Sequence, residues 1–190
     1  MPRPVLQTIA ASTRPGRRGI AIAQWIQRLA EEHSGFDVEL IDLAEVDLPI
    51  FDEPNHPRLQ QYTRQHTKDW SATVSRADAF VFVTPEYNHS FPASLKNALD
   101  YLNAEWADKP AGLVSYGGVS AGLRAATALK PILAALRMVP VVEAVSVPFF
   151  TQFVDGDDFV PNGELEAGGK AMLEELLRLA PALRRPRAGD

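Results

Sequence analysis

Residues 79–84 read AFVFVT, a run in which nearly every side chain is apolar. Successive side chains of a strand point to opposite faces of its sheet, so this run is apolar on both faces. A strand covered on both faces is typical of a parallel sheet, because the crossover connections place helices on both sides. The run therefore predicts a parallel sheet that lies between two layers of helices.

Strand-like and helix-like patterns alternate along the whole chain. Short apolar runs that end in turn residues predict five strands, at residues 5–11, 36–43, 79–84, 111–116 and 139–147. Apolar residues at helical spacing predict helices after Gly19, over 59–77, from a first turn that holds Pro92, over 121–137 with a bend at Pro131, and over a last segment that carries Leu173 and Leu176. Parallel strands joined by right-handed crossovers give a doubly wound α/β fold of three layers.

No linker-like segment or internal repeat interrupts this order, so residues 1–190 are expected to form a single domain. The tail over residues 181–190, which is rich in arginine, is expected to be frayed. We also expect the stretch with Phe149, Phe150, Phe153 and Phe159 to form an interface or pocket wall, or else to pack over the edge of the sheet.

The composition excludes several classes of function. The formal net charge is −5, which argues against a partner such as nucleic acid or a membrane surface. The chain has no cysteine, which excludes disulfides, thiolate nucleophiles and cysteine-ligated metals, and we expect no metal site. It shows no signal-peptide pattern and no apolar run near the ~18 residues of a membrane span. We therefore expect a cytoplasmic protein.

In doubly wound sheets, ligands bind beyond the carboxyl ends of the strands. The loop after the first predicted strand reads ASTRPGRRGIA and precedes a helix. Its hydroxyls at Ser12 and Thr13, the guanidinium of Arg14 and the amides of the helix start are suited to bind a phosphate. The loop lacks the spacing of a Walker motif and of GxGxxG. The alternative is an ordinary helix cap with solvated arginines.

The loop after the third predicted strand begins with TPEYNHSFP. Tyr87 offers a flat surface to a planar ligand, and Asn88 offers both an amide donor and an acceptor. The alternative is that both are ordinary loop residues, and His89 is expected to be a surface histidine.

The loop after the fourth predicted strand reads SYGGVSAG. Its adjacent glycines, Gly117 and Gly118, allow the backbone to approach a ligand closely and to direct N–H groups at it. The alternative is a tight turn between a strand and a helix.

Taken together, the motifs STRPGRRG, PEYNHSFPASLKNALDYL and SYGG followed by SAG resemble the NADPH-dependent FMN reductase family of flavodoxin-like proteins. The resemblance extends from about Val5 to Val142 and implies the strand order 2-1-3-4-5. It implies a bound FMN, NADPH or NADH as electron donor, and a small-molecule acceptor such as a quinone, free flavin, metal oxyanion or azo compound. It also implies a homodimer or homotetramer.

The resemblance assigns three groups of residues to FMN. The groups are Ser12, Arg14, Arg17, Gly19 and Ile20 for the phosphate, Pro85, Glu86, Tyr87 and Asn88 along the isoalloxazine ring, and Ser115, Gly117 and Gly118 at its far edge. No side chain is assigned as a catalyst, because the hydride passes to the flavin N5. Many relatives carry serine where this chain has Arg17. An alternative is that Arg17 and Arg18 serve the phosphate of the second substrate.

Two other functions are compatible with these motifs. A flavodoxin-type electron carrier would bind FMN without turning over NADPH. Such carriers are usually strongly acidic around the flavin, whereas the loop after the first predicted strand holds arginines. An FMN-binding regulatory protein would keep every binding motif, so only a steady-state assay separates it from an enzyme.

Overall fold

The computed structural model describes residues 3–33 and 35–184. Its centre is a parallel sheet of five strands in the order β2-β1-β3-β4-β5, which confirms the expected order. The strands are β1 (Val5–Ala10), β2 (Asp37–Asp42), β3 (Ala79–Pro85), β4 (Pro110–Tyr116) and β5 (Val139–Val147). Every residue of β3 and β4 is buried, as expected of apolar strands in the middle of a three-layer fold.

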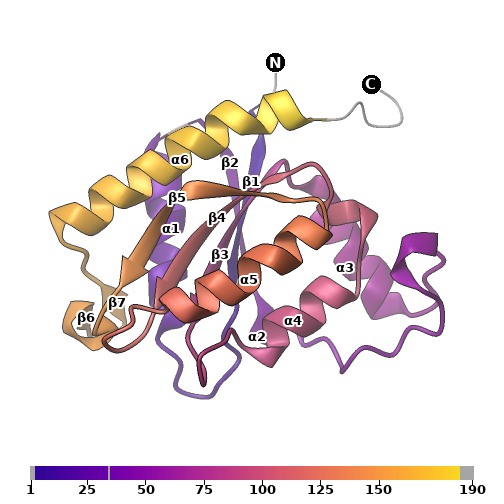
Figure 1. The fold of residues 1–190 in the computed structure, drawn as a ribbon, viewed down its shortest axis with the longest axis horizontal. Helices are drawn as coiled ribbons and strands as arrows, with labels where there is room; N and C mark the ends of the chain where they lie inside the picture. Colours follow the sequence, from indigo (N-terminus) through magenta and orange to yellow (C-terminus); the bar gives the residue numbers. More distant parts are fainter. Residues whose placement is uncertain (1–2, 34, 185–190) are drawn as a thin grey trace.

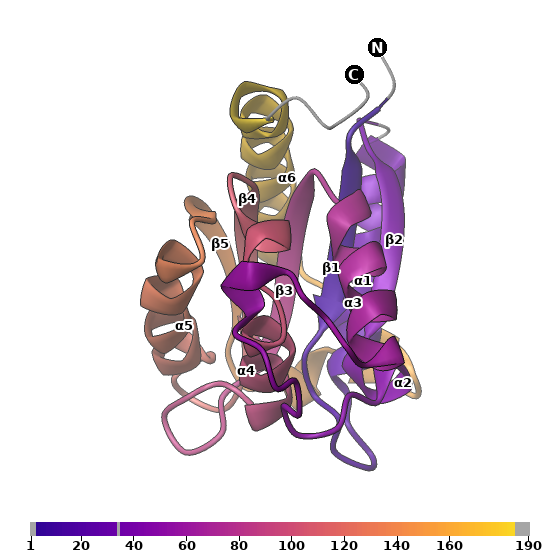
Figure 2. The same cartoon turned by 90° about the vertical axis from the view of Figure 1, so that its right-hand side faces the viewer.

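Helices cover both faces of this sheet. They are α1 (Gly19–His33), α2 (Leu43–Val46), α3 (Gln65–Arg76), α4 (Ala93–Asp100), α5 (Leu123–Ala135) and α6 (Gly163–Leu183). Helices α1 and α6 lie on one face, and α3, α4 and α5 lie on the other (Figure 1; Figure 2). Ile22 and Ile26 belong to the apolar core under α1 and α6, and Trp70 and Leu99 belong to the core on the opposite face. The predicted doubly wound fold is therefore confirmed.

Shorter elements complete the chain. They are the 3₁₀ turns η1 (Pro57–Leu59), η2 (Ala104–Trp106) and η3 (Phe150–Phe153), and the antiparallel pair β6 (Val154–Asp155) and β7 (Asp158–Phe159). Phe159 packs against Trp25 with ring centroids 5.1 Å apart, and Phe150 packs against Tyr116 at 5.2 Å. Most of the predicted aromatic stretch thus packs onto the core of the α1 and α6 face, and Phe149 is its exposed member.

The sequence placed the start of the third helix too early. A helix was expected from residue 59, but α3 begins at Gln65. The carboxylate of Glu53 accepts hydrogen bonds from the amides of Thr63 and Arg64, at 2.9 and 2.8 Å. These two amides therefore bind a side chain, and the helix begins directly after them. The short helix α2 was not expected at all. It follows β2 directly because the side chain of Asp42 caps it.

Three other helix boundaries also differ from the predictions. Pro92 is the N-cap residue of α4, directly before the helix, and does not lie in its first turn. Helix α5 is shorter than predicted at both ends, since Ala121 and Gly122 have φ of 53° and 77° before it and Arg137 has φ of 64° after it. Helix α6 continues through Pro181 to Leu183, so the start of the expected frayed tail is helical, and residues 185–190 lie outside the described part. Within the described residues, no helix has the length and apolar character needed to cross a bilayer.

Candidate functional site

The loops that follow β1, β3 and β4 leave the sheet at the same edge, which is the lower edge of Figure 1. Because all five strands are parallel, this edge collects the carboxyl ends of the strands, where doubly wound proteins bind ligands. We refer to residues 11–18 as the first loop, to 86–92 as the second loop and to 117–122 as the third loop. The three loops predicted from the sequence are therefore brought together.

The first loop forms a turn that leaves several donors open. The amide of Arg17 donates to the carbonyl of Arg14 at 3.0 Å, with Pro15 and Gly16 between them. Gly16 has φ of 72°, so Pro15 and Gly16 hold the positions that a type II turn favours for these residues. Within the described residues, the amides of Arg18, Gly19 and Ile20 have no acceptor, as expected at a helix start.

Two arginines of the first loop have different surroundings. Arg14 is exposed and forms no ion pair with any described residue. Arg18 donates to the carbonyl of Gly156 at 2.9 Å and to Asp157 at 3.1 Å, so it binds the turn between β6 and β7. Arg14 is thus available to an anion, and Arg18 serves the contact with its own chain.

The third arginine, Arg17, forms an ion pair with Asp42 at the end of β2. The side chain of Asp42 is 6% exposed and that of Arg17 is 23% exposed. The Nε atom of Arg17 is buried and has no hydrogen-bond partner among the described residues. A buried donor without an acceptor is costly, and an oxygen of a bound phosphate would satisfy it.

Gly19 allows a buried tyrosine to reach the start of α1. A Cβ atom on Gly19 would lie 2.0 Å from the phenol oxygen of Tyr116, so this position requires glycine. Burial and the nearby Tyr87 raise the pKa of Tyr116, while Ser12, Arg14 and Arg17 act in the opposite direction. The phenol therefore stays neutral beneath the first loop.

The second loop begins with a tight hairpin turn. Tyr87 and Ser90 exchange backbone hydrogen bonds of 2.8 and 3.0 Å, and Asn88 and His89 between them have φ of 49° and 68°. Positive φ at both central residues is the requirement of a type I′ turn, which asparagine tolerates well. The hydroxyl of Tyr87 lies 2.7 Å from that of Ser12, which is 2% exposed, so a hydrogen bond joins the first and second loops.

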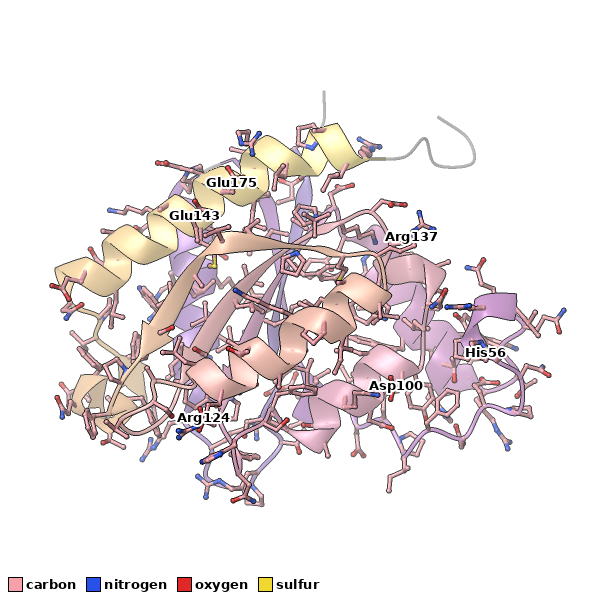
Figure 3. All side chains as sticks on the ribbon, in the orientation of Figure 1. His56, Asp100, Arg124, Arg137, Glu143 and Glu175 are labelled. Atoms are coloured by element: carbon pink, nitrogen blue, oxygen red, sulfur yellow. The ribbon has the colours of Figure 1, made fainter. Side chains whose placement is uncertain are left out.

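The side chain of Glu86 binds the third loop and the start of α5. Its carboxylate accepts from the Ser120 hydroxyl at 2.9 Å and from Arg124 Nε at 2.6 Å. Although desolvation raises its pKa, the hydrogen bonds from Arg124 and Ser120 outweigh this and hold the pKa below its usual value. Arg124 lies at the end of α5 that faces the site edge, and Arg137 marks the far end of that segment (Figure 3).

The third loop is held by hydrogen bonds within the chain. The hydroxyl of Ser115 donates to the carbonyl of Ala121 at 2.9 Å, and the amide of Gly117 donates to the carbonyl of Val147 at 3.2 Å. By contrast, a Cβ atom on Gly118 would meet nothing within 4 Å. The carbonyl of Gly118 accepts from the amides of Ala121 and Phe149, so of its two backbone groups only the amide is open within the described residues. The Ser115 side chain holds the turn itself.

The remaining predicted residues lie beside these groups. Pro85 ends β3 and is buried, and Ile20 is half-buried in the first turn of α1. Sequence reasoning missed Asp42, Tyr116 and Arg124. Asp42 carried a readable signal, because aspartate is a favoured N-cap residue and here it ends β2 just before α2 begins. The pairing of Arg124 with Glu86 joins positions 38 residues apart and has no sequence signature.

These features fit a mononucleotide with a planar ring. Open amides, the exposed Arg14 and the unpaired Nε of Arg17 suit a phosphate, and the exposed backbone of the second and third loops suits a ring. The fold is that of a flavodoxin-like protein, and these loops are its candidate site for a mononucleotide.

The sequence matches the NADPH-dependent FMN reductase family over residues 6–152, and the chain belongs to this family. It is 41% identical to the NAD(P)H-dependent FMN reductase of Schizosaccharomyces pombe over 149 residues, which are 76% of this chain and 74% of that protein. It is 31% identical to a quinone reductase of Pseudomonas putida over 136 residues, or 68% of this chain and 69% of that one.

Among solved structures, the flavoenzyme NAD(P)H:acceptor oxidoreductase FerB of Paracoccus denitrificans has a TM-score of 0.76 with this chain. The match covers 94% of this chain and 98% of FerB at 21% identity, so it supports the fold alone. The family match confirms the resemblance found in the sequence, and with it the class of activity, an FMN-dependent oxidoreductase that uses NAD(P)H.

Proposed function

We propose that this protein binds FMN at the carboxyl edge of its sheet and uses NAD(P)H to reduce a small planar acceptor such as a quinone. The observation that carries the proposal is the meeting of the first and second loops, which are joined by the hydrogen bond of 2.7 Å between Ser12 and Tyr87. This contact puts a loop suited to a phosphate beside a loop suited to a ring. A single mononucleotide spans both.

In this proposal the first loop holds the phosphate. The open amides at the start of α1 donate to its oxygens, and the helix dipole favours its negative charge. Arg14 and Arg17 add charge-assisted hydrogen bonds, and Ser12 adds a hydroxyl from a buried position. Gly19 and Ile20 contribute through their backbone.

The second and third loops hold the ring. Pro85, Glu86, Tyr87 and Asn88 line it mostly through backbone atoms, and Ser115, Gly117 and Gly118 form the wall at its far edge. When bound, FMN supplies the chemistry by accepting a hydride from NAD(P)H and passing two electrons to the acceptor. The protein binds and orients the partners, and no side chain is required as an acid or a base.

The test is a comparison of two ligands that differ only in the phosphate. Purified protein is stripped of flavin and titrated with FMN and with riboflavin, with binding followed by quenching of flavin fluorescence. We expect FMN to bind at least about 100-fold more tightly, because several charge-assisted hydrogen bonds are lost with riboflavin. Equal affinities would contradict the phosphate site. A steady-state assay with NADPH and a quinone then tests the activity, and its absence would favour the electron carrier or regulatory protein.

We extend the proposal to a homodimer or homotetramer. Val119, Leu123 and Phe149 are exposed apolar side chains on or next to the third loop, beside the site. A second copy of the chain that covers them would bury apolar surface and exclude water from the ring. Size-exclusion chromatography with light scattering gives the mass of the assembly, and a monomer at micromolar concentration would contradict this extension. The location in the cytoplasm is likewise a proposal, which fractionation of cells tests.

A further inference from the structure

Asp42 is a buried carboxylate that lies next to the first loop and holds two groups at once. Its Oδ1 accepts a hydrogen bond of 3.0 Å from the amide of Ala44, which caps α2. Its Oδ2 accepts from the guanidinium of Arg17. Asp42 pairs with Ala10 in the register of β1 and β2, so it stands beside the point where the first loop leaves the sheet.

The charge of Asp42 and its contacts lead to opposite predictions for the affinity of the protein for FMN. A negative side chain near a phosphate dianion repels it, so electrostatics alone predicts that loss of this charge tightens the binding of FMN. Its contacts, however, fix Arg17 through one nitrogen of the guanidinium, while the Nε of the same group is buried without a partner. A guanidinium fixed by one ion pair has fewer orientations, so its remaining donors are already oriented when a ligand binds.

We propose that Asp42 is a positioning residue for the phosphate of FMN, which it serves by holding the guanidinium of Arg17 in the first loop. This inference rests on the proposed function, because it needs a phosphate at that loop. It assigns different roles to Arg17 and Arg14. The exposed Arg14 meets the ligand from solvent without a partner in the described chain, whereas Arg17 is fixed before the ligand arrives. Preorganisation of this kind raises affinity because less side-chain freedom is lost on binding.

The variant Asp42→Asn isolates this role. Asparagine is as good an N-cap as aspartate, but its side chain has one acceptor oxygen where aspartate has two. When this oxygen caps α2, the group that faces Arg17 is an NH2, which donates and cannot accept, so the contact with the guanidinium is lost. We expect the dissociation constant for FMN to rise about tenfold, which corresponds to about 1.4 kcal/mol. The dissociation constant for riboflavin is expected to stay within twofold, because riboflavin has no phosphate.

Asp47→Asn is the matched control. Asp47 ends α2 with φ of 48°, a conformation that asparagine adopts readily, and it borders a cavity of about 300 Å³ that Thr13 of the first loop also lines. It removes the same charge near the same loop, and among the described residues its side chain forms no hydrogen bond or ion pair with Arg17. We expect its FMN affinity to be unchanged or slightly higher. Tighter FMN binding by Asp42→Asn as well would show that only charge matters and would overturn the inference.

A double-mutant cycle tests whether Asp42 acts through Arg17. In an Arg17→Ala background, Asp42→Asn is expected to change the FMN dissociation constant by less than twofold. A full tenfold loss in that background would overturn the inference. If Asp42→Asn does not fold, as judged by thermal unfolding, Asp42→Ser keeps a capping hydroxyl and replaces it in the cycle. Should the wild-type protein bind FMN no better than riboflavin, the proposed function itself fails, and the wild-type titration reveals this before any variant is measured.

Discussion

The first loop and the third loop lie at the same edge of the sheet but are built in opposite ways. In the first loop, Arg14 is exposed and amides at the start of α1 have no acceptor within the described residues. In the third loop, side chains and amides are bound to the chain itself, as when Ser115 donates to Ala121 and Ser120 donates to Glu86. The first loop keeps donors open for a charged group, whereas the third loop is a preformed backbone wall.

This difference predicts two kinds of variant. Removal of an open donor of the first loop should weaken FMN and leave riboflavin and the fold unaffected, because the proposed role of these donors is to bind the phosphate. Changes in the third loop and its contacts should weaken both flavins alike or destabilise the fold, because that loop acts through its shape. The ratio of the FMN and riboflavin dissociation constants therefore measures the contrast directly.

The largest effect is expected from Gly122→Ala. Gly122 has φ of 77°, and a Cβ atom there would lie 2.6 Å from the amide nitrogen of Tyr116. The left-handed conformation costs an alanine about 1–2 kcal/mol, and the overlap with a backbone atom adds about 1–3 kcal/mol. We expect a large fall in the free energy of unfolding and loss of both flavins, measured by denaturant titration and fluorescence quenching.

Gly118→Ala is the control for that variant. A Cβ atom on Gly118 would meet nothing within 4 Å, and its φ is not in the left-handed region. Its free energy of unfolding is expected to stay within about 0.5 kcal/mol of the wild type. Equal destabilisation by both variants would mean that the third loop is not held at Gly122.

Arg14→Ala is expected to give the next largest effect, and only with FMN. A hydrogen bond to a charged group contributes about 1.5–3 kcal/mol, so the FMN dissociation constant should rise about 10-fold to 100-fold. Riboflavin affinity and thermal stability should not change, because Arg14 has no ion pair with a described residue. Arg18→Ala is the matched control, since Arg18 binds Gly156 and Asp157, and its effect on FMN should stay below about threefold. A similar loss in both variants would indicate a diffuse charge effect instead of a defined phosphate contact.

Glu86→Gln is expected to weaken both flavins by a smaller amount. The carboxylate of Glu86 ties the second loop to Ser120 and to Arg124. Because glutamine keeps one acceptor but loses the charge, we expect both dissociation constants to rise by about tenfold or less, or about 1.4 kcal/mol. Glu175→Gln is the control, because it removes a carboxylate–arginine pair on α6 that lies far from the site (Figure 3). It should change neither dissociation constant. An effect on FMN alone would place Glu86 with the phosphate instead of with the ring.

The same carboxylate gives a pH dependence. Its hydrogen bonds lower the pKa of Glu86 in the folded state, so the folded protein holds its charged form more strongly than the unfolded chain does. The stabilisation is fully present above the usual glutamate pKa of about 4.3 and is lost as the pH falls through the lower folded value. In Glu86→Gln, thermal stability should therefore fall less steeply than in the wild type below about pH 4.3. Identical slopes would contradict the ion pair with Arg124.

The sequence predicted the fold well because the fold depends on local patterns. The apolar run of β3 and the helical spacing of Ile22, Ile26 and Leu29 are periodic, and each marks a buried face. Boundaries were less predictable where a distant side chain sets them. Helix α3 begins late because Glu53, ten residues from Thr63, occupies the amides before it.

For the site, motifs indicated which backbone segments meet but not how their side chains pair. Arg17 was assigned to the phosphate, yet its partner Asp42 lies 25 residues away and depends on the register of β1 and β2. Tyr87 was expected to lie flat against a ring. Its hydroxyl also reaches Ser12 across 75 residues of sequence, a contact that only the assembled sheet creates.

The contact between Ser12 and Tyr87 joins the first and second loops, and it gives the smallest predicted effect. The hydroxyl of Ser12 has one proton and two lone pairs, so it can accept from Tyr87 and still donate to a phosphate. Such a chain of hydrogen bonds strengthens each member. Tyr87→Phe keeps the ring and removes the hydroxyl, and we expect the FMN dissociation constant to rise about fivefold, or about 1 kcal/mol, with riboflavin unchanged.

The direction of this change decides which group is the donor. If Ser12 instead gives its proton to Tyr87, the Tyr87→Phe variant frees that proton and FMN binds more tightly than in the wild type. In Ser12→Ala, the further change Tyr87→Phe should have no effect on FMN, because the chain of hydrogen bonds is already broken. A loss of both flavins in Tyr87→Phe would assign Tyr87 to the ring alone, and the first and second loops would then act independently.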